Sequence, residues 1–136
     1  MVYTYHLNEN AKKLKVPFDD TFNNKLKTIG KDAFFACDSL KTVNLNRCET
    51  KSNLGLALNS ADELRQFKVS KKNRKFSVKD GVLFNKSGTK LIMYPVGKSN
   101  KRYTVPSKVS SIGDYAFYCA YKLNKITLPK KLKTIG

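Results

Sequence analysis

Internal repetition is the feature that most constrains how this chain can fold. Residues 26–30 read LKTIG, the same run recurs unchanged at 132–136, and the related VSSIG stands at 109–113. The last two runs define a period of about 23 residues, and when the units that begin at Leu26 and Val109 are aligned, six identities fall at apolar or glycine positions, where chance gives about one. A unit this short cannot bury its own apolar side, so the chain must be stabilised by stacking of neighbouring units.

The end of each unit shows an alternation that is typical of a short strand. Val43 and Ile126 have polar neighbours on both sides, so the apolar side chains should point inward and the polar ones toward solvent. Pro106 and Pro129 follow two of these strands, one repeat apart, and proline ends strand pairing because it lacks an N–H. We therefore expect a mainly β repeat solenoid, in which short turns or 3-10/helical segments connect strands that stack into a thin parallel sheet.

An aromatic residue recurs after the Ile-Gly pair in each clear copy of the repeat. Phe34 and Phe117 occupy the same aligned position, and each directly follows an alanine. A large ring beside a small residue suits a closely packed interior. We expect both rings to be buried and to belong to an interior ladder of stacked rings.

One stretch departs from the repeat and indicates an insertion. The runs 76–84 and 90–95 are rich in β-forming residues, and the segment 85–89 between them has the composition of a hairpin loop. The sequence thus predicts an inserted β-hairpin unit within a single domain, 1–136. Its expected parts are a divergent N-terminal segment 1–25, a repeat 26–48, a degenerate repeat 49–70, an extended hairpin-containing repeat 71–108, a repeat 109–131 and the start of a truncated repeat 132–136.

The residue inventory argues against catalysis, cofactors and metals. The single histidine, His6, lies near the N-terminus, and the three cysteines contain no C-x-x-C pair. The seven glycines form no phosphate-binding motif. We expect no enzyme, cofactor or metal site. Cys37 and Cys119 are expected to fill core positions, while a disulfide between Cys37 and Cys48 stays open.

Charge is the strongest compositional signal about partners. The chain has 27 Lys plus Arg against 10 Asp plus Glu, a formal net charge of +17, so it favours acidic partners. Residues 65–108 contain thirteen basic residues and one acid, Asp80. No segment long enough to span a membrane is free of charged residues, and residues 1–6 lack the basic segment and apolar run of a signal peptide.

The repeat pattern resembles that of a known family. Residues 112–129 read I-G-x2-A-F-x5-L-x2-I-x-L-P, and 29–45 follow the same pattern, which resembles the BspA-like, treponemal-type leucine-rich repeat. The segments 80–84, 90–95 and 103–106 resemble the extended unit that often interrupts such arrays. The resemblance implies a right-handed solenoid, display on a cell surface or secretion, adhesion to a host cell or matrix protein, and no enzyme activity. It carries over no invariant binding residues.

The alternation predicts which side chains form a contact surface. Polar residues that alternate with the buried ones should line a continuous, mildly curved sheet face suited to an extended segment of a protein partner, or the face is simply solvated. The residues of this predicted face are Thr42, Asn44, Gln66, Lys68, Arg102, Thr104, Lys125 and Thr127.

A basic patch within residues 65–108 offers an alternative contact surface. It suits a polyanion, either an anionic glycan or a nucleic acid. Nucleic acid is disfavoured because the aromatic residues interleaved with the charges fall at repeat spacing and are expected in the core. The residues of this predicted patch are Lys71, Lys72, Arg74, Lys75, Lys79, Lys98 and Lys101.

The last residues raise a question about the end of the array. Residues 132–136 open a further repeat without a polar cap, and terminal repeats need such a cap to cover the interior. We expect either a fragment of a longer array or self-association through this C-terminal end.

Overall fold

The computed structural model describes residues 13–15 and 28–136, and within them it is built mainly of short strands. His6, Leu26 and most of the divergent segment 1–25 lie outside the described residues. One short helix, α2, occurs in the described part of the chain. The elements are β1 Lys13–Lys15, β2 Thr42–Asn44, α2 Leu54–Ala57, β3 Gln66–Lys68, β4 Phe76–Lys79, β5 Val82–Asn85, β6 Lys90–Met93, β7 Arg102–Thr104, β8 Ser111–Ile112, β9 Lys125–Thr127 and β10 Thr134–Ile135.

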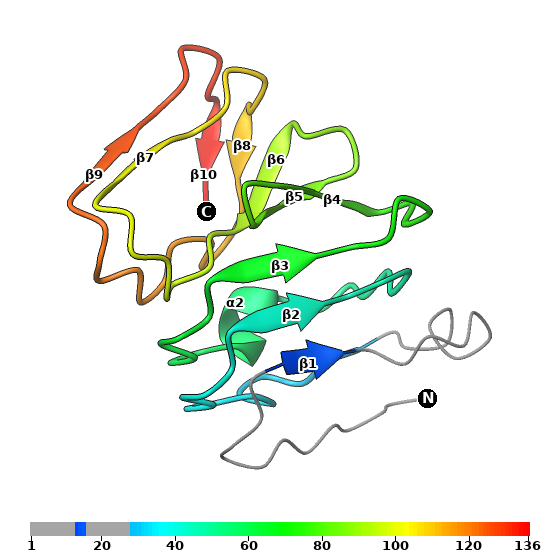
Figure 1. Ribbon diagram of the computed structural model, residues 1–136. Helices are drawn as coiled ribbons and strands as arrows, with labels where there is room; N and C mark the ends of the chain where they lie inside the picture. The colour runs from blue at the N-terminus through cyan, green and yellow to red at the C-terminus, as the bar shows by residue number, and fades with distance from the viewer. Residues whose placement is uncertain (1–12, 16–27) are drawn as a thin grey trace.

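The strands form three sheets whose parallel pairs follow the repeat of the sequence (Figure 1). The first sheet has the order β1-β2-β3, the second β10-β8-β6-β5-β4, and the third β7-β9. Thr42 of β2 lies opposite Gln66 of β3, and Arg102 of β7 lies opposite Lys125 of β9. Each of these partners is one repeat further along the chain, so stacking of units supplies the pairing that no single unit has.

The inserted unit contains two hairpins, where the sequence predicted one. β4 and β5 pair antiparallel, with Lys79 opposite Val82, so Asp80 and Gly81 form the turn between them. Both turn residues have positive φ, 52° and 79°, as a tight hairpin turn that matches strand twist requires. β5 then pairs antiparallel with β6 across the expected loop. The run 76–84 is thus a hairpin in itself, and the Asp-Gly pair within it was the missed signal.

The expected ladder of rings is only partly present. Phe34 is 2 % exposed and packs in a cluster with Leu40 and Val43. Phe117 is half-buried and belongs to a second cluster, where its ring stacks on Tyr94 at a centroid distance of 5.5 Å. The inward position of the aromatic is retained in both copies, but the two rings lie in different clusters. The prediction of one continuous ladder was therefore wrong, because the inserted hairpins place their own strands between the two repeats.

The strands that carry the predicted face do not form one sheet. β2 and β3 belong to the first sheet and β7 and β9 to the third. Beside β3, the backbone N–H of Phe67 donates to the carbonyl of Gly81 at 2.8 Å, so the hairpin turn takes the position where a further strand would pair. The prediction of a continuous sheet was wrong at this point.

Candidate functional site

The predicted face is present as two separate pairs of strands. On β2 and β3, Thr42 lies opposite Gln66 and Asn44 lies opposite Lys68. The corresponding residues of β7 and β9 are paired in the same way, Arg102 with Lys125 and Thr104 with Thr127. The repeat register thus brings the eight predicted residues together two by two.

The two halves of the face differ in exposure. Arg102, Thr104, Lys125 and Thr127 are all exposed on β7 and β9. On β2 and β3, Lys68 is exposed, while Asn44 and Gln66 are half-buried. The β7–β9 half is therefore the more accessible to a partner.

Thr42 is the exception on the predicted face. It is 7 % exposed, and its hydroxyl oxygen accepts a hydrogen bond from the Gln66 amide at 3.2 Å. Its strand, β2, has a paired strand on each side, β1 and β3. The expectation that Thr42 lines an open surface was wrong, since its side chain is buried and held by the amide of Gln66.

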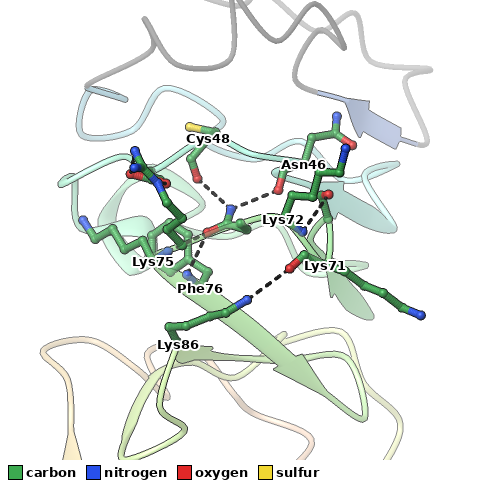
Figure 2. A network of polar contacts seen from close by, with 11 residues as sticks. Asn46, Cys48, Lys71, Lys72, Lys75, Phe76 and Lys86 are labelled. Carbon is green, nitrogen blue, oxygen red and sulfur yellow. Dashed lines mark hydrogen bonds and ion pairs between the residues drawn. The ribbon is translucent and has the colours of Figure 1, made fainter.

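The first half of the basic patch is a loop held in place by one buried amide. Asn73 is 1 % exposed and donates from Nδ2 to the carbonyls of Asn46 and Cys48 at 2.9 and 3.0 Å. Its Oδ1 accepts the backbone N–H groups of Lys75 and Phe76 at 2.9 and 2.8 Å. Figure 2 shows this clasp, which joins the loop 70–75 to the loop of the preceding unit. Sequence analysis missed Asn73, because nothing in a lysine-rich loop marks one amide as buried.

Several charges of this loop have defined partners. Arg74 forms an ion pair with Glu49 at 3.0 Å, and Lys86 donates to the backbone carbonyl of Lys71 at 3.3 Å. The Lys75 ammonium donates to the carbonyl of Thr50 and lies 5.2 Å from the centre of the Phe76 ring. Partial burial lowers the pKa of Lys75, and the neighbouring Lys51 lowers it further.

The loops that follow the face strands, together with the hairpin loop 86–89, are joined into one edge of the molecule. The Asn73 clasp joins the first two loops, and the side chain of Lys86 joins the loop 70–75 to the hairpin loop. The N–H of Ser110 donates to the carbonyl of Thr89 at 2.8 Å, which joins the hairpin loop to the loop after β7. The N–H of Lys133 donates to the carbonyl of Ser110 at 2.8 Å, which joins that loop to the loop after β9. In Figure 1 these loops succeed one another from the right of the view to its top. We call the basic residues on this edge the basic rim. They are Arg47, Lys71, Lys72, Arg74, Lys75, Lys86, Lys108, Lys130, Lys131 and Lys133.

The predicted patch is divided between this rim and other places. Lys71, Lys72, Arg74 and Lys75 lie in one loop on the rim, but Lys98 and Lys101 precede β7 and therefore lie on the opposite edge. The ammonium of Lys98 donates to the carbonyl of Asp80 at 2.7 Å. Sequence proximity thus grouped lysines that the fold separates.

The repeat spacing in the sequence marks two other rim lysines as neighbours. Lys108 and Lys131 each stand shortly after a proline that ends a face strand, at the same position of neighbouring repeats. Equivalent positions in a stacked array lie side by side.

A hollow opens between the inserted hairpins and the loop after β7. Its volume is about 360 Å³. Three lysines line it, Lys79, Lys86 and Lys108, and no carboxylate of the described residues does. Its remaining lining consists of Ser77, Phe84, Ser87, Gly88, Pro106 and Ser107.

Each of the three cysteines carries a thiol and forms no disulfide in this structure. Cys48 is buried, while Cys37 and Cys119 are half-buried, so the two cysteines expected in the core fill their positions only in part. Burial, followed by the charge of Asp38, raises the pKa of the Cys37 thiol.

Among residues 13–15 and 28–136, no three His, Cys, Asp or Glu side chains gather as a metal site would require. The same part of the chain contains no helix that could span a membrane.

Comparison with known proteins agrees with the repeat seen in the structure. The chain matches the family described as BspA type leucine rich repeat region (6 copies) over residues 10–95 and 96–136. No curated protein matches the chain.

Similar solved structures are also leucine-rich repeat proteins. A leucine-rich repeat protein from Eubacterium ventriosum is 30 % identical with a TM-score of 0.65, covering 72 % of this chain and 26 % of its own length. The pneumococcal vaccine antigen PcpA is 30 % identical with a TM-score of 0.65, covering 71 % of this chain and 24 % of its own. A leucine-rich cell surface protein from Faecalibacterium prausnitzii is 22 % identical, with a TM-score of 0.52 over 73 % of this chain and 30 % of its own, and shares the fold. The chain spans about a quarter of the length of the first two proteins. By its repeat spacing, its match over nearly all of its length and its structural neighbours, this chain belongs to the BspA-type leucine-rich-repeat family.

Proposed function

We propose that this chain is a non-enzymatic protein-interaction or adhesion module, displayed on a cell surface, whose partner protein lies across the predicted face. Leucine-rich repeats in general serve protein interaction rather than catalysis. The proposal includes a right-handed solenoid, the form that the family resemblance implies. The surface location is likewise what the family resemblance implies.

The observation that carries this proposal is the exposed pair of strands β7 and β9. Arg102 and Thr104 stand opposite Lys125 and Thr127 in parallel register, and all four are exposed. Such a row presents charged and hydroxyl groups at the strand spacing of about 4.8 Å. With Lys68 on β3, the face is cationic, which would speed encounter with an acidic protein surface.

The test is binding to a panel of purified extracellular-matrix proteins by surface plasmon resonance. The face variant carries Lys68→Glu, Arg102→Glu and Lys125→Glu, and a matched control carries Lys72→Glu, Lys108→Glu and Lys131→Glu on the rim. We expect the face variant to lose at least about tenfold in affinity, while the control binds nearly as the parent. Unaltered binding by the face variant, or equal losses in both variants, would refute the assignment of the partner site to this face.

A second candidate function is polyanion binding, and the ten basic residues gathered on the rim favour it. Its site would be the basic rim rather than the face.

A further inference from the structure

The basic rim is a row of loops in which basic residues far outnumber acidic ones. Its five loops, 46–50, 70–75, 86–89, 106–110 and 129–133, contain ten basic residues and one acid, Glu49. That carboxylate is already paired with Arg74. The hydrogen bonds that join the loops fix their order along the edge, so the charges lie in a row rather than in scattered turns.

The opposite edge, formed by the loops that precede the face strands, has a mixed charge. Its basic residues are interleaved with the acids Asp38, Asp62 and Glu63. Glu63 lies 3.0 Å from Arg65 and 4.0 Å from Lys122. Among the described residues, the excess of basic over acidic side chains is therefore larger on the rim than on this edge, and a surface of one charge sign attracts polyanions. The basic residues of this edge are Lys41, Arg65, Lys98, Lys101 and Lys122.

The hollow gives the rim a place for one ring-shaped group. Phe84, 3 % exposed, and Pro106 supply its apolar lining, while Lys79, Lys86 and Lys108 supply ammonium groups. Serine side chains make up much of the rest. An apolar patch beside hydroxyl groups and cations suits a sugar ring that bears an anionic substituent, since each part of such a ring finds a matching group.

We propose that the basic rim binds a linear acidic polysaccharide, with one sulfated or carboxylated sugar residue seated in the hollow and further anionic groups along the row of rim lysines. This site is distinct from the face, and the proposal rests on the second candidate function, polyanion binding at the rim, for which it names the class of polyanion. The repeat places Lys108 and Lys131 at equivalent positions of neighbouring units, so a chain lying along the rim meets a cation at each unit.

The aromatic residues favour a polysaccharide over a nucleic acid. Single-stranded nucleic acids are held by exposed rings on which bases stack. Phe76 and Phe84, the rings next to the rim loops, are both 3 % exposed. The exposed rings of the described residues lie off the rim, at Phe35, Tyr115, Tyr118 and Tyr121.

The experiment compares two pairs of lysines that carry the same charge in different places. The rim pair is Lys108→Gln with Lys131→Gln, and the control pair is Lys41→Gln with Lys101→Gln. All four side chains are exposed. The control lysines are themselves equivalent, because the carbonyl of each accepts two backbone N–H groups from the next unit. Both variants lose the same net charge, so only the position of the charge differs.

Binding is measured by isothermal titration calorimetry at several salt concentrations. The probes are a heparin oligosaccharide, which bears sulfates, an oligogalacturonate, which bears only carboxylates, uncharged dextran, and a single-stranded DNA oligomer. We expect the parent to bind one or both acidic sugars but not dextran. The rim pair should lose about tenfold in affinity and lower the slope of log K against log salt by about 2, and the control pair should lose less than about twofold. The two acidic sugars show whether sulfate or carboxylate is the preferred group.

A third variant tests the hollow without changing charge. Ser107 is exposed and lines the hollow, so Ser107→Phe should fill it, leave the fold intact by circular dichroism, and weaken sugar binding several-fold.

Equal losses in the rim and control pairs would overturn the rim site. DNA binding as tight as sugar binding, with the same loss in the rim pair, would overturn the polysaccharide assignment. The face variant should bind the sugars as the parent does, so this proposal and the protein-binding proposal fail separately.

Discussion

At the scale of single residues, Asn73 shows how one side chain can order a charged loop. Its amide donates to two carbonyls of the preceding unit and accepts the N–H groups of Lys75 and Phe76, and two of these four hydrogen bonds are fully buried. Buried polar groups are stable only when hydrogen-bonded. The lysines around Asn73 therefore project from a backbone that is anchored to its neighbour.

Asn73→Ala should destabilise the protein because it removes four hydrogen bonds, two of which are buried. We expect the free energy of unfolding to fall by about 2–4 kcal/mol, measured by urea denaturation. Asn100→Ala, at an exposed position, is the control and should change it by less than about 0.5 kcal/mol. A loss at Asn73 no larger than that of the control would contradict the clasp.

The thiol of Cys37 should react slowly at neutral pH. Burial and then Asp38 raise its pKa, so the thiolate that reacts with iodoacetamide is scarcer than for an ordinary cysteine. Asp38→Asn removes one of the two causes and should speed alkylation at pH 8, followed by peptide mass spectrometry, with Cys119 as internal reference. Because the folded state holds this proton more tightly, the thiol's contribution to stability is complete below its ordinary pKa and is lost as pH rises through the raised value. Alkylation at an unchanged rate in Asp38→Asn would contradict the electrostatic cause.

At the scale of elements, the turn between β4 and β5 decides how the insertion meets the first sheet. Gly81 has φ of 79°, and a Cβ there would lie 3.0 Å from the Gln66 Cβ and 3.3 Å from the Arg65 carbonyl. The turn thus needs glycine both for its backbone conformation and for its close approach to β3.

A pair of glycine substitutions separates these two requirements. Gly88 also has positive φ, 72°, but a Cβ there would meet nothing within 4 Å. Gly88→Ala should cost about 1 kcal/mol of unfolding free energy from backbone strain alone, and Gly81→Ala about 2–4 kcal/mol because the contact is added. Urea denaturation of both variants measures the difference. Equal losses would mean that the turn does not press against β3.

At the scale of the whole molecule, exposed apolar side chains gather along β9 and β10. Ile126 and Leu128 on or next to β9 and Ile135 on β10 are 36, 48 and 63 % exposed. β10 is the edge of the five-stranded sheet, and β9 pairs only with β7 among the described strands. Open edges with apolar side chains favour pairing with another strand.

We predict that this chain self-associates through that edge. Leu128→Lys with Ile135→Lys should abolish concentration-dependent association in sedimentation velocity, because charged side chains oppose edge pairing. Phe35→Lys, which changes an exposed apolar residue elsewhere, should leave association unchanged. A parent chain that is monomeric throughout the concentration range would contradict the prediction.

Repetition and alternation let the sequence determine the family, the strand positions and much of the core. Val43, which the alternation predicts to point inward, lies opposite Phe67 in a parallel strand, and both side chains are buried. These features follow from a local rule, since alternation decides which side of a strand is apolar and the period decides which strands are neighbours.

Only the tertiary structure decided where the insertion docks and which lysines share an edge. The carbonyl of Gly81 pairs with Phe67, Asn73 joins two loops, and Lys101 lies across the molecule from Lys108 although they are close in sequence. These arrangements depend on contacts between segments from different units, and a residue's own neighbours in sequence carry no information about the segment that packs against it. The sequence therefore determined the repeating unit, and the stacking of unlike units determined the surfaces that can bind a partner.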